Sequence, residues 1–574
     1  MRSSIPISVE NSERAGTRWD LLAMLLVFAL IVSFAESSRH VLQPLAALQV
    51  APVSLDPHYL PEYATRTTWR MLLALALSLL FTFTYATLAA KSKRAEVLLV
   101  PLLDILQSVP ILGFISVTVV FFMSLAPGRV LGAEFAAIFA IFTSQAWNMA
   151  FSFYQSLRTV PLELTEASRM FRLSGWAHFW RAEVPFAMPQ LIWNMMVSMS
   201  GSWFFVVASE AISVGNTTVT LPGIGSYIAL AIQQKNLAAV GWAIGAMLVV
   251  ILLYDQILFR PLVAWADRFR FEQQAGAVAP QSLVLAVLRR SRIIAIVTAP
   301  LSDLWQRTYR PLPMLRAPRR GASGKTGRWA DRLWSGLFAV AALLALWRVG
   351  HFVLPGLPLA EVGKALLLGL ITLLRVTVLI AIASVIWVPI GVMVGTRPRL
   401  AQLIQPVAQF LAAFPANVLF PVFVVAIVSL HLDADIWLSP LMILGTQWYI
   451  LFNVVAGAAA IPNELRDVGT NLQCRGWLWW KKIALPAVFP YFATGAITAS
   501  GGSWNASIVA EVASWGDTHL QANGLGAYIA GATEAGDMHR VVLGIAVMSL
   551  YVVIVNRAFW RPLYWYAERK CRLG

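Results

Sequence analysis

Residues 166–169 of this chain read Glu-Ala-Ser-Arg, and residues 467–470, at an offset of 301, read Asp-Val-Gly-Thr. The surroundings repeat at the same offset. Gly175 returns as Gly476, Pro185 returns as Pro486, and the offset holds from residue 161 to residue 262 without a gap. A chance similarity would not keep one spacing over that length. We infer that the chain contains two copies of one unit and that any functional site occurs twice.

The composition is that of a polytopic membrane protein, because 58% of the 574 residues are hydrophobic and only 13% are charged. A formal net charge of +16 could indicate binding to nucleic acid. The basic residues instead lie between long apolar stretches, which is typical of loops retained on the cytoplasmic side. We therefore expect the lipid bilayer as the surroundings and no nucleic acid as a partner. Two cysteines, in segments assigned to the cytoplasm, imply no disulfide framework.

A membrane-spanning helix needs about 20 apolar residues, and each half of the chain offers six such stretches. The fold expected is therefore all-α, with about twelve membrane-spanning helices in two six-helix repeats. Because six is even, the second repeat enters the membrane in the same sense as the first, so the repeats are expected to be parallel. The predicted spans are residues 19–37, 69–90, 97–125, 131–154, 187–213, 239–260, 333–354, 364–395, 402–430, 435–459, 488–513 and 540–560.

These spans divide the chain into a first membrane domain (1–262), a basic linker (263–332) and a second membrane domain (333–574). The linker holds thirteen Lys or Arg against four Asp or Glu, and the positive-inside rule then places both termini in the cytoplasm. Within it, segment 283–300 is apolar but contains three arginines, each costing roughly 2.5–3.5 kcal/mol at the bilayer centre. We expect an interfacial helix there, and short outer helices in loops 215–238 and 516–538.

Segments 158–189 and 459–490 are predicted to be helical hairpins. Pro161 and Pro462 suit the first position of a helix, and acidic residues follow where they favour the positive end of the helix dipole. A turn is expected at Gly175 and Gly476 before a second amphipathic piece. Such a hairpin is too polar to cross the bilayer and too apolar to be a free loop. It is either a lid on its own helices or, as we favour, a docking element for a cytoplasmic partner.

The hairpins resemble the Glu-Ala-Ala loop of bacterial ABC importer permeases, in which the acidic motif is followed by a glycine and then by I-x-L-P. The stretches Leu55–Tyr59, Thr67–Arg70 and Pro101–Pro110 are similar to the nitrate/taurine/sulfonate branch, and within it to the duplicated permease of anion importers. The resemblance covers about residues 60–262 and 360–567. The family's glycine six residues after the acid is Arg172 in one copy and Gln473 in the other, which we interpret as a turn shifted to Gly175 and Gly476.

This resemblance implies the partners. In the family the loop is a coupling helix that sits in a groove of a cytoplasmic ATPase, so two ATPase copies, carrying ATP and Mg²⁺, are expected. A periplasmic substrate-binding protein and a location in the bacterial inner membrane are implied as well. The ATPase-coupling residues implied by the match are Glu163, Glu166, Ala167, Arg169, Gly175, Pro185, Glu464, Asp467, Val468, Thr470, Gly476 and Pro486.

No catalytic residue, metal site or cofactor site is predicted in this chain itself. Residues 323–326 (Ser-Gly-Lys-Thr) resemble the end of a phosphate-binding loop, but the pattern requires glycine at position 319, which is Arg319. The chain is therefore not expected to be an enzyme, and the energy for transport must come from another chain.

Polar residues inside spans are costly and are therefore candidates for the translocation pathway. The Gly-Ser pairs of the fifth spans suit close helix packing equally well. For Arg70 and Arg375 the default is a side chain that reaches to the interface, with attraction of an anion as the alternative, and Glu210 and Glu511 are expected to tether outer loops. The pathway candidates are Asp104, Gln107, Ser108, Gln145, Asn148, Ser202, Trp203, Gln409, Gln447, Ser503, Trp504, Asn505, Arg70 and Arg375.

These observations predict the permease subunit of an ATP-driven importer that moves a small anion, such as nitrate, bicarbonate, a sulfonate or an organic acid, by alternating access. The alternative is a secondary transporter or channel without an ATPase, which would have similar hydropathy but no need for the duplicated hairpin. A membrane-embedded scaffold or sensor is the third possibility, disfavoured by the polar residues repeated at mid-span.

Overall fold

The structure is a computed structural model. It describes residues 53–269, 282–291 and 347–571, apart from 109–110, 215–216, 354, 460 and 462, together with scattered residues within 20–44 and 296–344. Most of the predicted linker, including residues 319–326, lies outside the described residues. So do parts of the predicted spans 19–37 and 333–354.

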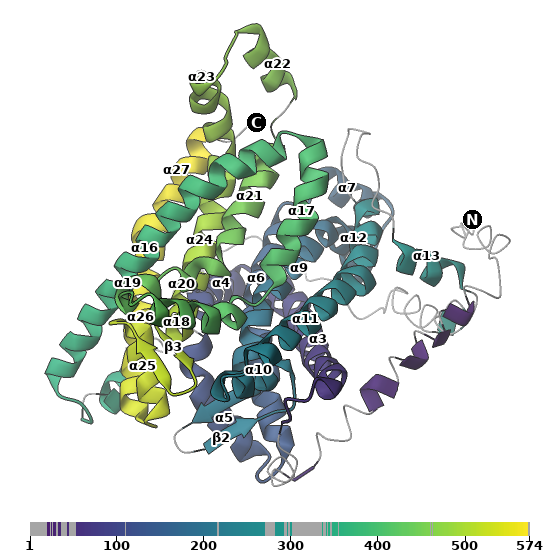
Figure 1. Cartoon of the computed structure of the whole chain (residues 1–574). Helices are drawn as coiled ribbons and strands as arrows, with labels where there is room; N and C mark the ends of the chain where they lie inside the picture. The colour runs from purple at the N-terminus through teal and green to yellow at the C-terminus, as the bar shows by residue number, and fades with distance from the viewer. Residues whose placement is uncertain are drawn as a thin grey trace.

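The first half is a bundle of long apolar helices joined by short ones (Figure 1). Its long members follow the hydrophobic runs, and each ends where polar or helix-breaking residues begin. The helices that correspond to the predicted spans are α3 (Leu60–Lys91), α4 (Lys93–Ser108), α5 (Ile111–Leu125), α6 (Val130–Arg158), α9 (Val184–Glu210) and α11 (Leu237–Tyr254), which continues through η4 (Asp255–Phe259) into α12 (Arg260–Ala266) and η5 (Asp267–Phe269). The shorter elements are η2 (Pro57–Tyr59), α7 (Leu162–Met170), α8 (Gly175–His178), η3 (Phe179–Glu183), α10 (Ile224–Gln233) and α13 (Leu283–Arg290).

The second half repeats this order of elements. The helices that correspond to its predicted spans are α16 (Leu359–Gly395), α17 (Pro398–Ala413), α18 (Phe420–Ser429), α21 (Gln447–Ala459), α24 (Leu485–Ala510) and α26 (Met538–Val555), which continues through η8 (Asn556–Trp560) into α27 (Arg561–Cys571). The shorter elements are η6 (Ala416–Leu419), α19 (Ala434–Trp437), α20 (Leu441–Leu444), α22 (Asn463–Asn471), α23 (Trp477–Trp479), η7 (Trp480–Ala484) and α25 (Leu525–Glu534).

The all-α polytopic fold is confirmed. Among the described residues, seven helices are long and apolar enough to cross a membrane, or eight when α19–α20 and α21, which meet at a 43° bend, count as one span. The predicted third span of the second half differs from the expectation of one continuous helix. There α17 ends at Ala413, just before Pro415, and η6 follows. Proline lacks an N–H and clashes with the preceding turn, so it breaks the span there. In the first half, residues 109–110, between α4 and α5, lie outside the described residues.

Each half carries a two-stranded antiparallel hairpin that the sequence analysis did not foresee. In the first half β1 (Ala211–Val214) pairs with β2 (Thr217–Thr220), and in the second β3 (Val512–Trp515) pairs with β4 (Thr518–Gln521). β-Branched residues favour these strands. Gly516 takes a φ of +57° in the second turn, which suits a tight two-residue hairpin loop. The short outer helices α10 and α25, which follow the hairpins, are as predicted.

Each half has its own hydrophobic core, and the two cores interlock. Val418 of the second half packs in the first-half core, and Phe204 and Phe205 of α9 pack against the second-half core. In return α5 contacts α24 and α26. Because α9 and α24 run from the α7/α22 side to hairpins that meet the opposite half, the two halves have the same sense, as a parallel repeat requires. Figure 1 shows α22 and α7 toward one end and β2, β3, α10 and α25 toward the other.

Candidate docking elements and central helices

The first docking element is α7 with the turn that follows it. Pro161 is the N-cap, one residue earlier than predicted, and Glu163 lies in the first turn. The helix exposes large apolar side chains at its end: Met170 is 84% exposed and Phe171 is 79% exposed. Of the predicted coupling residues, Glu163, Glu166, Arg169 and Gly175 are exposed and Ala167 is half-buried. Clustered exposed apolar side chains among charges are typical of a protein–protein contact surface.

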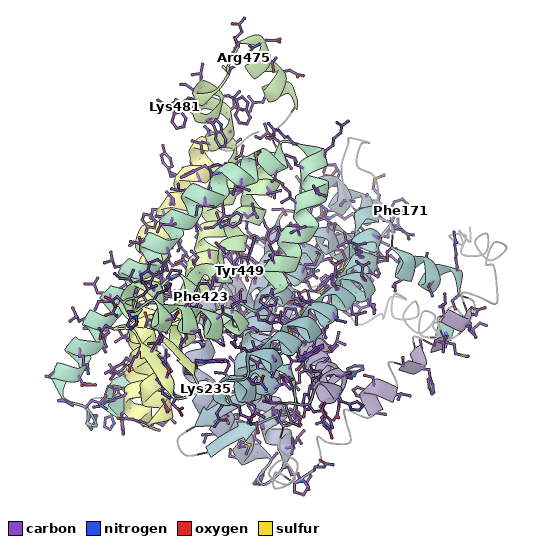
Figure 2. The ribbon with its side chains drawn as sticks, viewed as in Figure 1. Phe171, Lys235, Phe423, Tyr449, Arg475 and Lys481 are labelled. Carbon is purple, nitrogen blue, oxygen red and sulfur yellow. The ribbon has the colours of Figure 1, made fainter. Side chains whose placement is uncertain are left out.

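The second docking element, α22 and α23, exposes a similar surface at the same end of the bundle. Leu472 is 70% exposed, Trp477 is 74% exposed, and Val468 is also exposed. Asp467 and Thr470 share this exposure, whereas the side chain of Glu464 lies outside the described ones. Figure 2 shows Phe171 on one element and Arg475 on the other, both at the periphery of the molecule.

The turns after the two docking helices are nearly identical, which corrects the prediction of a turn at Gly175. Arg172 and Gln473 have φ values of +47° and +52°. In each copy the next amide donates to the carbonyl five residues back, Leu173 to Ser168 at 3.0 Å and Cys474 to Gly469 at 2.8 Å. This is the Schellman end of a helix, in which a left-handed residue terminates the turn. The turn thus stays where the family has its glycine, and Gly175 merely begins α8.

A π-helical turn, η3 or η7, connects each docking element to the long helix behind it. α9 and α24 begin directly after these turns, with Pro185 and Pro486 in their first turns, where no backbone N–H is required. In the second half, Ile483 of η7 packs against Ile461 and Ala487 and touches Gly469 of α22. Each candidate docking element is therefore joined without a loop to the long helix whose other end carries a β hairpin.

An ion-paired cluster ties the outer helix α10 to the first half. The Arg70 guanidinium is buried, donates two hydrogen bonds of 2.7 Å to Glu134, and donates a third of 2.7 Å to Glu210. Thr67 donates to Glu210 at 2.7 Å, and so does the amide of Gly225 in the first turn of α10, at 2.6 Å. A carboxylate at a helix N-terminus is favoured by the helix dipole. Glu210 thereby holds the outer loop, as the tethering hypothesis expects.

The second half builds the same cluster from Arg375, Asp435 and Glu511. Arg375 lies 2.9 Å from Asp435 and 3.3 Å from Glu511. Thr372 donates to Glu511 at 2.8 Å, and Ala527 of α25 donates to Glu511 at 3.1 Å. Both arginines are therefore turned inward onto carboxylates, which corrects the prediction that they reach to the interface. In this conformation neither guanidinium is available to an anion.

The outer hairpin of the second half crosses to the first half. The Gly516 amide donates to the Ile232 carbonyl of α10 at 3.0 Å, and Lys235 lies 2.8 Å from Asp517. Trp515 packs against the cores of both halves. Figure 2 shows Lys235 at this outer end, opposite the docking elements. These contacts join the halves at the end of the molecule opposite α7 and α22.

The centre of the molecule joins the halves through small residues and one tyrosine. A side chain added at Gly201 on α9 would lie 2.8 Å from the Tyr449 hydroxyl on α21 of the other half, and Figure 2 shows Tyr449 in the middle of the bundle. Asn417 donates to the Phe204 carbonyl at 3.2 Å across the same boundary. The sequence analysis missed Tyr449 and Asn417, because their contacts with α9 join helices that are far apart in the sequence.

The predicted pathway residues of α6, α9, α21 and α24 fall into hydrogen-bonded pairs within each half. Ser202 contacts Ser144 at 2.8 Å, and Ser503 contacts Thr446 at 2.9 Å. Further bonds link the remaining polar residues: Asn148 to Ser198 (2.9 Å), Gln145 to Ser78 (3.3 Å), Gln447 to Trp387 (2.9 Å) and Asn505 to the Gly501 carbonyl (3.2 Å).

Trp203 and Trp504, predicted as pathway residues, are buried in the hydrophobic cores of their halves. Trp203 packs edge-on to Tyr254 with ring centroids 5.8 Å apart, and Trp504 stacks on Tyr551 at 6.3 Å. Each indole faces an aromatic ring of its own half and not the boundary between halves. Gln107 is exposed, and the side chains of Asp104, Ser108 and Gln409 lie outside the described ones. Among the described residues, no group of three or more His, Cys, Asp or Glu could hold a metal ion.

Comparison with known proteins identifies the family. The family described as binding-protein-dependent transport system inner membrane component matches this chain twice, at residues 78–263 and 387–559. The chain belongs to that family, with two copies of its domain fused in one polypeptide, and is a multi-pass inner-membrane protein of the ABC transporter class.

Individual relatives match different shares of the chain. The bicarbonate transport system permease protein CmpB of Synechococcus elongatus is 27% identical over 42% of this chain and 94% of its own length. The nitrate import permease protein NrtB of Leptolyngbya laminosa is 26% identical over 32% of this chain and 63% of its own length. The trimethylamine N-oxide transport system permease protein TmoV of Pelagibacter ubique is 20% identical over 84% of this chain and 69% of its own length.

Proposed function

We propose that this chain is the complete membrane pathway of an ATP-driven importer of a small anion, with one ATPase subunit docked on α7 and a second on α22. The observation that carries the proposal is the pair of exposed apolar surfaces around Phe171 and Trp477. They occur at equivalent positions of two parallel repeats. A two-fold pair of docking surfaces suits a two-fold pair of motor subunits.

The mechanism follows from the connections of α9 and α24. ATP binding that closes the two ATPase subunits draws α7 and α22 together, and each docking element pulls on the long helix that follows it. These helices meet the opposite half around Gly201 and Tyr449, so the halves rock about that contact. The outer hairpin contact at Gly516 is then released as the inner side closes. The ATPases supply the free energy, and this chain supplies two packings of differing stability.

The orientation proposed places α7, α22 and both termini in the cytoplasm. Support comes from the basic residues on that side, including Lys91, Arg172, Lys481 and Lys482, because cytoplasmic loops retain an excess of Lys and Arg. Labelling of single cysteines with an impermeant maleimide tests this. In a background with Cys474 and Cys571 replaced by serine, Met170→Cys and Asn471→Cys are expected to react only after the cells are opened. Reaction in intact cells would contradict the whole assignment.

The anionic substrate is proposed from relatives whose names state bicarbonate and nitrate. A relative named for trimethylamine N-oxide, a molecule without net charge, covers more of this chain, and so that substrate class is the competing candidate. We further propose that a periplasmic binding protein delivers the substrate to the outer hairpins. Uptake of labelled bicarbonate, nitrate and trimethylamine N-oxide by cells that gain or lose the chain discriminates between these substrates.

Copurification tests the docking sites. A tagged chain is expected to retain an ATP-hydrolysing subunit, and Glu166→Lys combined with Asp467→Lys is expected to lose it, because both acids lie on the exposed docking faces. Glu534→Lys reverses an exposed charge at the opposite end and serves as the control, with retention unchanged. If the ATPase never copurifies, a secondary transporter or channel becomes the better interpretation.

A further inference from the structure

A cavity of about 480 Å³ opens where the end of α16 meets η7 in the second half. Its walls are mostly apolar, from Ile390, Met393, Trp479 and Trp480, and Arg397 provides a positive charge at its edge. Both flanking helices are membrane spans that end here. The cavity therefore lies at the level where the hydrocarbon of a bilayer gives way to headgroups, the depth at which tryptophan is enriched.

Two further cations follow the tryptophans. Lys481 and Lys482 lie on η7 and are exposed, and Figure 2 shows Lys481 projecting from this side of the molecule. Across the part of the chain that the structure describes, no carboxylate lies within ion-pair distance of Arg397, Lys481 or Lys482. The surface beside the apolar cavity is thus positively charged, and none of the described carboxylates neutralises it.

The equivalent place in the first half is closed by its own side chains. Lys91, which corresponds to Thr396, lies 2.8 Å from Glu183 and 4.9 Å from the centre of the Phe179 ring. Glu183 also lies 3.2 Å from His178. In the second half the position of Glu183 is occupied by Ala484, so neither partner of this closure is present. The two halves therefore differ here: the first has a lysine paired with a glutamate, and the second has neither residue beside its cavity and Arg397.

We propose that the second-half cavity, which we call the α16–η7 groove, binds one anionic phospholipid of the adjacent leaflet. Its phosphate is held at Arg397, and an acyl chain lies along Ile390, Met393 and the two tryptophans. Charge complementarity favours an anionic headgroup, because cations next to the membrane attract anionic lipid. The apolar walls favour a lipid over a soluble anion, because they bury hydrocarbon.

The bound lipid would brace the second docking element. Trp479 lines the groove and also packs against the cluster of Ile461, Ile483 and Ala487, which adjoins α22. In the first half the ion pair between Lys91 and Glu183 stabilises η3, so no bound lipid is needed there. That consequence, unlike lipid binding itself, rests on the proposed docking function.

Native mass spectrometry of the purified full chain tests the proposal with phosphatidylglycerol and phosphatidylcholine as probes. The unaltered chain is expected to retain phosphatidylglycerol in preference. Arg397→Gln is expected to lower its affinity about fivefold, the effect of one cation at a membrane surface, and Met393→Trp, which fills the groove, is expected to lower retention of both lipids. Lys364→Gln removes an exposed charge from the opposite end of α16 and should change nothing. Thermal unfolding confirms that each variant is folded.

Equal retention of the two lipids by the unaltered chain would overturn the proposal, as would an Arg397→Gln variant with undiminished preference. Displacement by glycerol phosphate as effective as by lipid would show a site for a soluble phosphate and would also overturn it. A loss with Lys364→Gln equal to that with Arg397→Gln would show general surface charge only. Because lipid retention is measured on the chain alone, its outcome is independent of ATPase copurification.

Discussion

The two halves share one arrangement of helices but differ in the ion pairs that hold the helices of each half together. In the first half Arg70 is buried and forms a bidentate pair with Glu134, and Lys91 and Glu183 close the inner end. In the second half Arg375 forms longer bonds to a half-exposed Asp435, and the inner end is open. The comparison teaches that the two copies keep the same order of helices and the same helix ends after α7 and α22. The ion pairs that hold each half together differ, because a few of their side chains have diverged.

The largest expected effect is a difference between the two outer clusters. Arg70→Ala leaves Glu134 and Glu210 buried without their cation, so we expect a loss of about 3–5 kcal/mol of stability, as for other broken buried ion pairs. Arg375→Ala should cost less, because Asp435 is partly exposed and also accepts bonds from Asn523. Unfolding in detergent measures both. Equal losses would show that the clusters are energetically the same.

The next prediction separates the contact between halves from packing within a half. Gly201→Ala places a methyl group 2.8 Å from the Tyr449 hydroxyl, and Gly502→Ala places one 2.5 Å from the Thr446 methyl. Each of these overpacked contacts should lower the free energy of unfolding by about 1–3 kcal/mol. Adding Tyr449→Phe should restore stability to the Gly201→Ala variant, because it removes the hydroxyl that the new methyl group meets. It should not restore stability to the Gly502→Ala variant. ATP-driven uptake and unfolding are the measurements, and relief of both variants would contradict the assignment of Tyr449 to the boundary.

Substitutions in the turns that follow α7 and α22 are expected to change stability by a smaller amount. Gly476 has a φ of +54°, but Gly175 begins a helix with ordinary backbone angles. Gly476→Ala should therefore cost about 1 kcal/mol, whereas Gly175→Ala should be tolerated. Arg172→Gly and Gln473→Gly should each stabilise their turn by a similar amount, because both residues are left-handed. Hydrogen exchange of α7 and α22 reports these local changes, and a loss with Arg172→Gly would refute the shared turn.

The smallest effect concerns the outer link between halves. The Lys235 ammonium lowers the pKa of the Asp517 carboxyl below its usual range, mainly through their hydrogen bond. A lowered pKa in the folded state means that the link stabilises above the usual Asp pKa of about 3.9 and is lost as pH falls through the lowered value. Asp517→Asn should therefore lower the unfolding temperature slightly at neutral pH and not in strong acid. High salt should also remove the difference, because both groups are exposed.

Much of the site could be predicted because it depends on local pattern. The 301-residue offset located both docking elements, and the Gly-x-Gly loops located the outer helices. Glu134 and Asp435 repeat at that same offset and could have been found from it as partners of the arginines. The broken third span of the second half was also signalled, by Pro415, but hydropathy over a long window averages across such a break.

The amino-acid sequence alone determined that this protein is a duplicated helical membrane bundle with a polar helical hairpin in each half, because hydrophobic run length, charge placement and an internal repeat can be read along the chain itself. Only the tertiary structure decided which polar side chains neutralise one another, which tryptophans are core, and which inner end is left open. Those outcomes depend on side chains brought together from distant helices, where a single change such as Glu183 to Ala484 between the copies removes a partner that no local pattern records.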